Sequence, residues 1–235
     1  MTDGMAIRFL EFAGRNVAYS VVGDGPPLVA PAWWVSHLEL DWQDRAFRAF
    51  WESVGAGHTM VRYDRPGVGL SDRDVAAEEL TLDAEVDLLG AVLDDLALEN
   101  VVLVGGSSGG CAAIAFAARF PQRVSSILLY GAYADGSSIT APEVREAILA
   151  TVRSHWGLGS RLLADVFLGD SSNVERERFA RSQRAAASPE MAAALLELIY
   201  RNDVRDELQR LSVPTLVVHR RGDRAIPYQL GRELA

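Results

Sequence analysis

The segment VVLVGGSSGG, residues 101–110, carries the clearest structural signal in this chain of 235 residues. Its four β-type residues, 101–104, indicate a central strand that is buried on both faces. The glycines and serines that follow turn the chain into an Ala-rich helix, expected over residues 111–120 and stopped by Pro121. Small residues on both sides of a serine tolerate a strained backbone and let strand and helix approach closely. The segment therefore predicts a strand–turn–helix corner that exposes a serine hydroxyl.

Both serines of this corner fit the pattern G-x-S-x-G, one register being centred on Ser107 and the other on Ser108. We take Ser107 as the nucleophile, because the apolar strand ends at Val104 and the exposed serine should follow it by about three residues. Ser108 then contributes its backbone amide to an oxyanion hole, since the N-terminus of a helix offers free amides. A serine hydroxyl is a weak nucleophile, so this interpretation also requires a base.

Two other interpretations of GGSSGG are a flexible turn and a phosphate-binding loop. Gly105 and Gly110 have the spacing of a phosphate-binding loop. Cys111 and Ala112 follow, however, where that loop requires Lys and then Ser or Thr, which removes the phosphate-binding interpretation. A purely structural turn stays open on the motif alone.

Working outward from this corner, short β-type runs alternate with helical patterns. Residues 17–22 and 28–31 are expected to be early strands, and apolar residues at helical spacing predict a helix over residues 81–96. A further β-type run covers residues 215–219. This alternation is typical of an α/β fold with a mostly parallel sheet and helices on both faces.

The pattern changes between about residues 136 and 210, where helical periodicity continues without strands. We therefore expect an α/β core over residues 1–135, a helical lid insert over 136–210, and a second, incomplete part of the core over 211–235. The lid should cover the carboxyl ends of the strands, where open α/β sheets bind ligands. Its Ala- and Leu-rich stretch, residues 191–200, suggests a modestly apolar substrate.

Three segments resemble those of the α/β-hydrolase fold family, and they occur in the family's order. VVLVGGSSGG is similar to the family's VLVGHSMGG elbow. RYDRPGVGLS, residues 62–71, resembles the D-x-R-G-x-G-x-S loop, with Pro66 in place of the usual Arg. PTLVVHRRGD, residues 214–223, is similar to the P-T-L-V-L-H-G-x-x-D segment that delivers the acid of the catalytic triad. Residues 23–40 further resemble hydrolase domains that are joined to adenylate cyclases or transcription factors.

The resemblance implies that Asp223 is the triad acid, which would hold an imidazole in the correct tautomer and stabilise its cation. A solvated turn aspartate is the competing interpretation, and Asp135 is the alternative acid. The second oxyanion amide should come from the loop after residues 28–31, where the family has His-Gly-x. By position Trp34 donates this amide, and Trp33 replaces the usual glycine. The two tryptophans either pack as ordinary large side chains or line the acyl pocket.

The general base is missing from the predicted triad. The triad of this fold runs in the order Ser, acid, His, whereas all four histidines precede Asp223: His37, His58, His155 and His219. The resemblance places the catalytic His beyond one more helix and strand, and the sequence ends at Ala235 in what looks like that helix. We therefore expect a hydrolase sheet that lacks its last helix and strand. Either the chain is a fragment, which we favour, or the domain naturally lacks this segment.

Composition excludes several classes of function. A net charge of −9 argues against a nucleic-acid surface, which needs clustered Lys and Arg, and against docking onto anionic membranes. The longest purely apolar run, residues 111–118, is far shorter than the roughly 20 residues of a membrane span, and the acidic N-terminus does not resemble a secretory signal. With one cysteine no internal disulfide can form, so we expect a cytoplasmic location. No metal-ligand spacing and no cofactor motif is found.

The sequence thus predicts a serine hydrolase that acts on a small ester-like molecule, a carboxylic ester or a thioester, and whose turnover is impaired. Its expected partners are a small-molecule substrate and, in a homodimer, a second copy. The alternative is a non-catalytic ligand-binding sensor on the same scaffold. A cofactor-free haloperoxidase or a dehalogenase is a third possibility, although a dehalogenase would need Asp at the position of Ser107.

Overall fold

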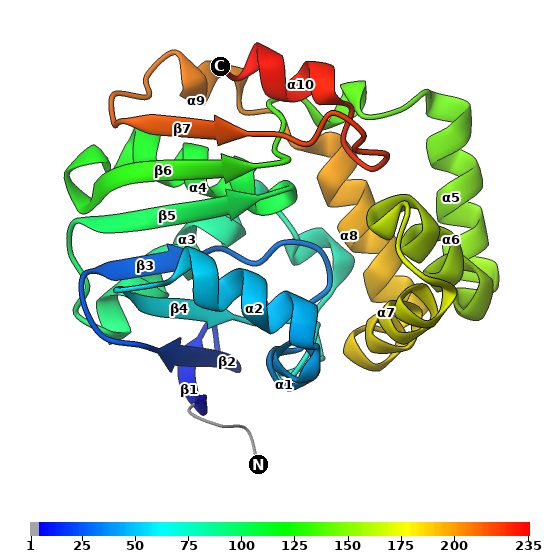
Figure 1. Cartoon of the computed structure of the whole chain (residues 1–235), viewed down its shortest axis with the longest axis horizontal. Coiled ribbons are helices and arrows are strands. Elements are labelled where there is room, and N and C mark those ends of the chain that lie inside the picture. The colour runs from blue at the N-terminus through cyan, green and yellow to red at the C-terminus, as the bar shows by residue number, and fades with distance from the viewer. Residues whose placement is uncertain (1–4) are drawn as a thin grey trace.

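The structure is a computed structural model that describes residues 5–235. Seven strands form one sheet in the order β1-β2-β4-β3-β5-β6-β7 (Figure 1). β1 pairs antiparallel with β2, and β2 pairs antiparallel with β4, whereas all other neighbours are parallel. The mostly parallel α/β-hydrolase sheet expected from the sequence is confirmed. The strands are β1 (Ala6–Phe12), β2 (Arg15–Val22), β3 (Pro27–Ala30), β4 (Thr59–Tyr63), β5 (Val101–Gly106), β6 (Val124–Tyr130) and β7 (Thr215–Val218).

β5 lies between β3 and β6 and is the strand that leads to the candidate site. Val101, Leu103 and Val104 have no solvent exposure, because helices cover both faces of the sheet at this point. Leu103 belongs to the larger of two apolar clusters and Val104 to the smaller one. The run of β-type residues is therefore explained by burial on both sides.

Helices flank the sheet on both sides in Figure 1, where α2 crosses in front of it and α3 and α4 lie behind. α4 is buried along most of its length, which explains its Ala-rich sequence, because small side chains let the helix approach the sheet closely. These helices and their short 3₁₀ companions are α1 (Leu38–Gln43), α2 (Arg45–Val54), η1 (Ala77–Glu79), α3 (Leu82–Asp95), α4 (Ser108–Arg119), η2 (Pro121–Arg123) and η3 (Gly136–Ser138).

Between β6 and β7 the chain forms helices and no strand, and every residue of this stretch is described. Four of these helices gather beyond the arrowheads of β5 and β6, at the right of Figure 1, so they lie past the carboxyl ends of the strands. The helices are α5 (Pro142–Ser154), α6 (Trp156–Leu168), α7 (Asn173–Ala186), α8 (Pro189–Arg201) and the short α9 (Arg205–Leu208).

α8 is a core helix, and this corrects one expectation. Its apolar residues from Met191 to Ile199 are buried in the larger cluster, and the hydroxyl of Tyr133 donates to the carbonyl of Ile199 at 3.0 Å. The Ala- and Leu-rich composition of residues 191–200 is explained by this packing. It therefore gives no information about the polarity of a substrate.

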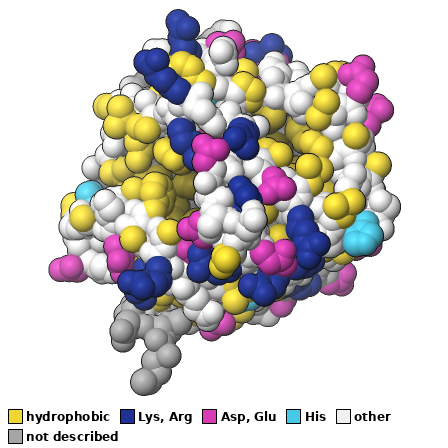
Figure 2. Space-filling view, turned by 45° about the vertical axis from the view of Figure 1, so that its right-hand side comes forward, with side chains coloured by type: hydrophobic (Ala, Val, Ile, Leu, Met, Phe, Trp, Pro, Cys, Tyr) yellow, Lys and Arg dark blue, Asp and Glu magenta, His cyan; other side chains and the backbone are white. Residues whose placement is uncertain are grey.

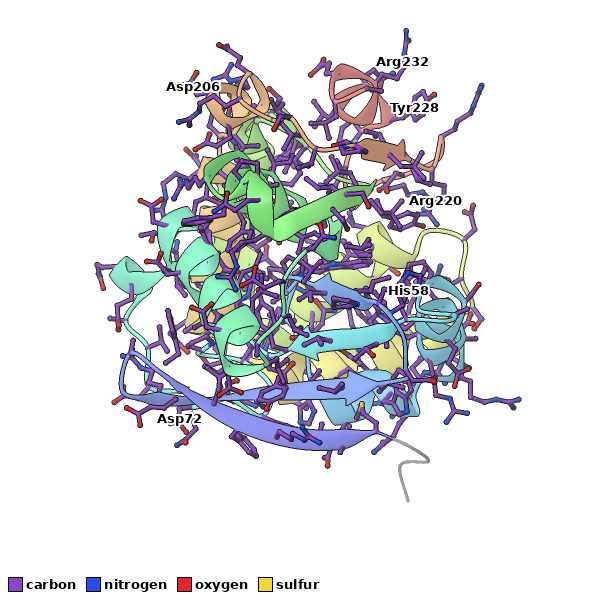
Figure 3. All side chains as sticks on the ribbon, turned by 90° about the vertical axis from the view of Figure 1, so that its left-hand side faces the viewer. His58, Asp72, Asp206, Arg220, Tyr228 and Arg232 are labelled. Atoms are coloured by element: carbon purple, nitrogen blue, oxygen red, sulfur yellow. The ribbon has the colours of Figure 1, made fainter. Side chains whose placement is uncertain are left out.

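The C-terminal part of the sheet ends at β7, which is paired with β6 alone among the described residues. α10 (Tyr228–Glu233) follows it, with Tyr228 and Arg232 labelled beside β7 in Figure 3. Leu216 and Val218 on β7 are 61% and 40% exposed. One face of the last strand is thus left uncovered by the described residues.

Figure 2 shows that hydrophobic side chains gather around a hollow at the surface of the molecule.

No helix of the described part of the chain is both long and apolar enough to cross a membrane.

Candidate active site

Ser107 lies at the corner between β5 and α4. β5 ends at Gly106 and α4 begins at Ser108, so Ser107 is the N-cap residue of the helix. Its backbone angles, φ 49° and ψ −125°, lie in a region that a side-chain-bearing residue adopts only under strain. The amide of Ser107 donates to the carbonyl of Tyr130 at 3.1 Å, which ties the corner to the end of β6. This backbone geometry is that expected of the strained strand-to-helix turn in a nucleophile elbow.

Glycines surround Ser107 because the neighbouring chain segments come very close. A Cβ at Gly105 would lie 2.7 Å from Cα of Gly110, and a Cβ at Gly110 would lie 2.5 Å from Cβ of Ala132. A Cβ at Gly106 would lie 2.2 Å from the indole of Trp33. Real Cβ atoms do not approach other atoms this closely, so these three glycines fit the corner where larger residues would not.

The two serines of the corner have different environments. Ser107 is half-buried, and its hydroxyl makes no hydrogen bond to another protein group among residues 5–235. Ser108 is 5% exposed, and its hydroxyl donates to the carbonyl of Trp33 at 2.8 Å. The geometry therefore favours the register centred on Ser107, in which the hydroxyl of Ser108 has a structural contact and its backbone amide stands at the helix N-terminus.

The loop after β3 packs against this corner. The indole of Trp33 lies over Gly106, stacks on Tyr130 with ring centres 6.2 Å apart, and contacts Trp51 at 5.2 Å. Trp33 therefore packs beneath the elbow. Trp34 is 8% exposed, and its indole donates through Nε1 to Oε1 of Gln183 on α7 at 2.8 Å. Trp34 thus links the loop to α7.

Two backbone amides are available at this place. Within residues 5–235, neither the amide of Trp34 nor that of Ser108 donates to a protein group. An unpaired amide in a largely buried region needs an acceptor from solvent or a ligand. Ser108 and Trp34, the residues assigned to the oxyanion hole from the sequence, therefore both carry an amide that can bind an anionic oxygen.

Asp223 follows β7 at the same edge of the sheet. Its Oδ1 accepts from the amides of Ala225 at 2.9 Å and Ile226 at 3.0 Å. Its Oδ2 would lie 3.4 Å from a Cβ at Gly131, the residue after the β6 carbonyl that binds the amide of Ser107. The structure thus brings Asp223 and Ser107 to the same end of β6. One carboxylate oxygen is held by the turn, and the other is left for a partner.

Asp135, the alternative acid, is used as a helix cap. Its Oδ1 accepts from the amide of Ser137 at 2.8 Å, and its Oδ2 lies 3.6 Å from Arg205 on α9. The hydrogen bond from Ser137 lowers the pKa of Asp135, with a contribution from Arg205. These contacts account for the residue without a catalytic role.

His219 lies close to Asp223 but is engaged elsewhere. Its Nε2 is 3.9 Å from Oδ2 of Asp223 and 2.9 Å from the carbonyl of Ile226, to which it donates. Its ring packs against Gly231 and, edge to face, against Tyr228 of α10. These contacts give His219 a packing role between β7 and α10.

The other histidines lie apart from the corner. His37 and His155 are N-cap residues of α1 and α6 and accept a backbone amide through Nδ1. His58 precedes β4 and lies at the amino end of the sheet, the end that faces the viewer in Figure 3. Among residues 5–235, no histidine forms a hydrogen bond with Ser107.

Cys111 is buried one turn into α4, where its side chain packs as a small apolar group. Burial raises the pKa of its thiol to about 12, so it stays protonated and unreactive at neutral pH. In the described part of the chain, no group of three or more His, Cys, Asp or Glu side chains is arranged to hold a metal ion.

Three supporting residues had not been singled out from the sequence. Asp64 is fully buried and accepts from the hydroxyl of Ser36 at 2.6 Å and from two backbone amides of adjoining loops. Arg65 donates to the carbonyls of the loop that contains Trp34. Gln183 on α7 accepts a hydrogen bond from the indole of Trp34. Asp64 and Arg65 belong to the segment RYDRPGVGLS, so its resemblance was the available signal, whereas nothing around Gln183 marks it in the sequence.

Comparisons with known proteins agree with this geometry. The family model described as "alpha/beta hydrolase fold" matches residues 35–168. A 2-hydroxy-6-oxo-6-phenylhexa-2,4-dienoate hydrolase from Comamonas testosteroni is 31% identical over 258 aligned residues, which cover 100% of this chain and 86% of the relative. A 2-hydroxy-6-oxononadienedioate/2-hydroxy-6-oxononatrienedioate hydrolase from Cupriavidus pinatubonensis is 32% identical over 191 residues, which cover 77% of this chain and 65% of the relative.

Solved structures show the same fold. A bromoperoxidase from Bacillus anthracis superposes with a TM-score of 0.82 at 21% identity, covering 98% of this chain and 86% of the other. An enol-lactonase from Burkholderia xenovorans superposes with a TM-score of 0.78 at 23% identity, covering 97% and 86%. The strand order, the elbow at Ser107 and these similarities lead to one conclusion. The chain belongs to the α/β-hydrolase fold family.

Proposed function

We propose that this chain carries the nucleophile, acid and oxyanion hole of a serine hydrolase that cleaves a small carbonyl compound. The observation that supports this most strongly is the backbone of Ser107, φ 49° and ψ −125°, at the end of a buried central strand. A strained conformation of this kind persists only where its surroundings enforce it, and it presents the hydroxyl at the carboxyl end of β5.

In the proposed reaction the oxygen of Ser107 adds to the substrate carbonyl carbon, and the carbonyl electron pair moves onto the oxygen. The amides of Ser108 and Trp34 stabilise that negative oxygen. When the intermediate collapses, the bond to the leaving group breaks and the leaving group takes up a proton. Water then releases the acyl group from Ser107. Asp223 would orient an imidazole that accepts the proton of the serine.

The class of carbonyl substrate has two candidates. The elbow and oxyanion amides suit an ester-like substrate, as expected from the sequence. The names of the similar hydrolases specify 2-hydroxy-6-oxo-dienoates, in which we take the 6-oxo group as the electrophile. The second candidate follows from relatives at 31–32% identity, and we favour it over a simple ester.

We also propose that turnover by this chain is slow. Among residues 5–235, no histidine contacts Ser107 to take its proton. Without a base, binding and the oxyanion hole still give some rate above that in water. The comparison of 2-hydroxy-6-oxo-6-phenylhexa-2,4-dienoate with p-nitrophenyl acetate under single-turnover conditions tests both points. Rapid hydrolysis of either substrate under these conditions would contradict slow turnover.

A fluorophosphonate tests the nucleophile independently of the substrate. The oxygen of Ser107 forms a bond to phosphorus as fluoride leaves with its electron pair, and the serine proton passes to solvent. We expect labelling of the wild type and of Ser108→Ala, which keeps its backbone amide, and no labelling of Ser107→Ala. Saturable binding of the probe without a covalent adduct would instead favour the sensor function.

A further inference from the structure

Arg65 is a buried cation on the loop after β4, and its side chain is 2% exposed. Its Nη2 donates to the carbonyl of Trp33 at 2.6 Å and to the carbonyl of Ala32. Its Nη1 lies 3.3 Å from Oε1 of Glu85 on α3. One guanidinium therefore connects the loop after β3 with a helix behind the sheet.

The carbonyl of Trp33 has a second donor, the hydroxyl of Ser108, at 2.8 Å. All described peptide bonds are trans, and in a planar trans peptide the carbonyl and the following N–H point in opposite directions. Two donors on the Trp33 carbonyl therefore fix the direction of the Trp34 N–H. That N–H points away from Arg65 and has no protein partner within residues 5–235.

The chemistry of this contact suits a positioning role. Hydrogen bonds from a cation are roughly twice as strong as those between neutral groups. A guanidinium presents its donors in a rigid fork, so Arg65 can hold the carbonyls of Ala32 and Trp33 while its other nitrogen faces Glu85. A lysine, with a single ammonium group, would not hold all three contacts in this geometry.

Arg65 also forms an ion pair with Glu85. An experiment on the loop has to separate the effect of this ion pair from the effect of the hydrogen bonds to the carbonyls. Glu85 is 8% exposed, and burial raises the pKa of its carboxyl while the charge of Arg65 opposes that rise. A substitution of Arg65 alone would leave this carboxylate buried without its partner, which destabilises a protein strongly. Replacing Glu85 in the same variant avoids that effect.

We infer that Arg65 is a positioning residue of the oxyanion hole: by holding the carbonyls of Ala32 and Trp33, it directs the Trp34 N–H toward the oxygen that becomes negative. This inference rests on the proposed function. It assigns Arg65 an effect on the reacting state and little effect on the binding of the uncharged ligand, because Arg65 lies on the far side of the peptide from the anion.

The test compares two variants that both lack the ion pair. Glu85→Gln is the control, and Arg65→Met/Glu85→Gln additionally lacks the donors to the loop. For each, the labelling of Ser107 by a fluorophosphonate is resolved into the inhibition constant KI and the maximal rate kinact, and the melting temperature is recorded. Arg65→Lys, which keeps the charge beside Glu85, serves as a second variant if the double variant does not fold.

We expect kinact of the double variant to be roughly 10- to 100-fold below that of Glu85→Gln, because small misplacements of a catalytic group cost about this much. KI should change by less than about twofold, as expected for a group that acts only on the reacting state. Arg65→Lys should fall between the two. The inference would be overturned if kinact were equal in the double variant and in Glu85→Gln. If the double variant does not fold, equal kinact in Arg65→Lys and in the wild type would overturn it. A wild type in which Ser107 is not labelled at all would overturn the proposed function and this inference with it.

Discussion

Ser107 combines a nucleophilic position with a costly backbone conformation. A residue other than glycine at φ 49° and ψ −125° is strained by about 1–3 kcal/mol, and this strain is what the elbow requires of its serine. The neighbouring glycines remove steric conflicts around the corner, but they do not relieve the backbone strain at Ser107 itself. The residue is therefore expected to reduce stability in exchange for reactivity.

The variant Ser107→Gly should consequently unfold at a higher urea concentration than the wild type, with a gain of about 1 kcal/mol. It should also lose all fluorophosphonate labelling. Ser107→Ala is the matched control, because it removes the hydroxyl but keeps a Cβ, and no gain is expected from it. If glycine does not stabilise the protein relative to alanine, the strain at this corner is not real.

Gly110 and Ala132 form a second residue-scale test, since a Cβ at Gly110 would lie 2.5 Å from that of Ala132. Gly110→Ala should lower the free energy of unfolding by about 1–3 kcal/mol, as overpacking does. Ala132→Gly in the same chain should restore most of the loss. Gly222→Ala, where a Cβ would meet nothing within 4 Å, is the neutral control. The account of the corner is wrong if the double variant is no more stable than Gly110→Ala.

The sequence predicted the residues of the elbow better than those that support it. Ser107 and Ser108 could be proposed because they follow a β-type run at a short distance, and Trp34 and Asp223 because they lie in segments that resemble those of the family. The contact between Trp34 and Gln183 joins positions 149 residues apart, and the contact of Arg65 with the Trp33 carbonyl spans 32 positions. Contacts over such separations depend on the packing of whole elements, which no local pattern shows.

At the scale of elements, α7 is joined to the oxyanion loop through Gln183, which is 1% exposed. Its Oε1 accepts from Trp34, and its Nε2 donates to the carbonyl of Ser160 on α6 at 2.9 Å. The hydroxyl of Ser160 accepts from Nη1 of Arg184, also on α7, at 2.7 Å. These bonds tie α6 and α7 to the loop that carries the proposed oxyanion amide.

Gln183→Leu should therefore destabilise the protein by about 1–3 kcal/mol, because it leaves the indole N–H of Trp34 buried and unpaired and removes a second hydrogen bond to the carbonyl of Ser160. Trp34 fluorescence should report this change if the other tryptophans are replaced conservatively. Gln122→Leu at an exposed position is the control. A Gln183→Leu variant as stable as the control would show that the hydrogen bonds of Gln183 do not stabilise the contact of α6 and α7 with the loop.

Element boundaries were predicted well where signals are strong and missed where they are weak. The helix expected over residues 81–96 is α3, Leu82–Asp95, which Thr81 caps through the amide of Ala84. The strand expected at residues 17–22 is β2, Arg15–Val22, whereas its hairpin partner β1, Ala6–Phe12, was not predicted. The turn at Ala13 and Gly14 has positive φ at both residues. That geometry usually selects Asn-Gly or Asp-Gly, so Ala-Gly gave no signal.

For the whole molecule, the uncovered face of β7 has a consequence in solution. β7 is an edge strand of the described sheet, and Leu216 on it is 61% exposed. Exposed apolar edge strands promote association between chains. We therefore predict that the chain self-associates as its concentration rises.

Leu216→Lys should weaken this association at least severalfold in sedimentation velocity and leave the melting temperature unchanged, because a charge on an edge strand opposes pairing. Val174→Lys is the control, since Val174 is 74% exposed on α7, away from the sheet. Association that is unaffected by Leu216→Lys, or lowered equally by Val174→Lys, would exclude β7 as the contact.

A crystal structure of the phosphonylated protein would show whether Ser107 is a nucleophile that faces an oxyanion hole. We expect a bond from phosphorus to the side-chain oxygen of Ser107, and a phosphoryl oxygen at about 2.7–3.1 Å from the amides of Ser108 and Trp34. Phosphorus on another residue, or a phosphoryl oxygen that contacts neither amide, would contradict it.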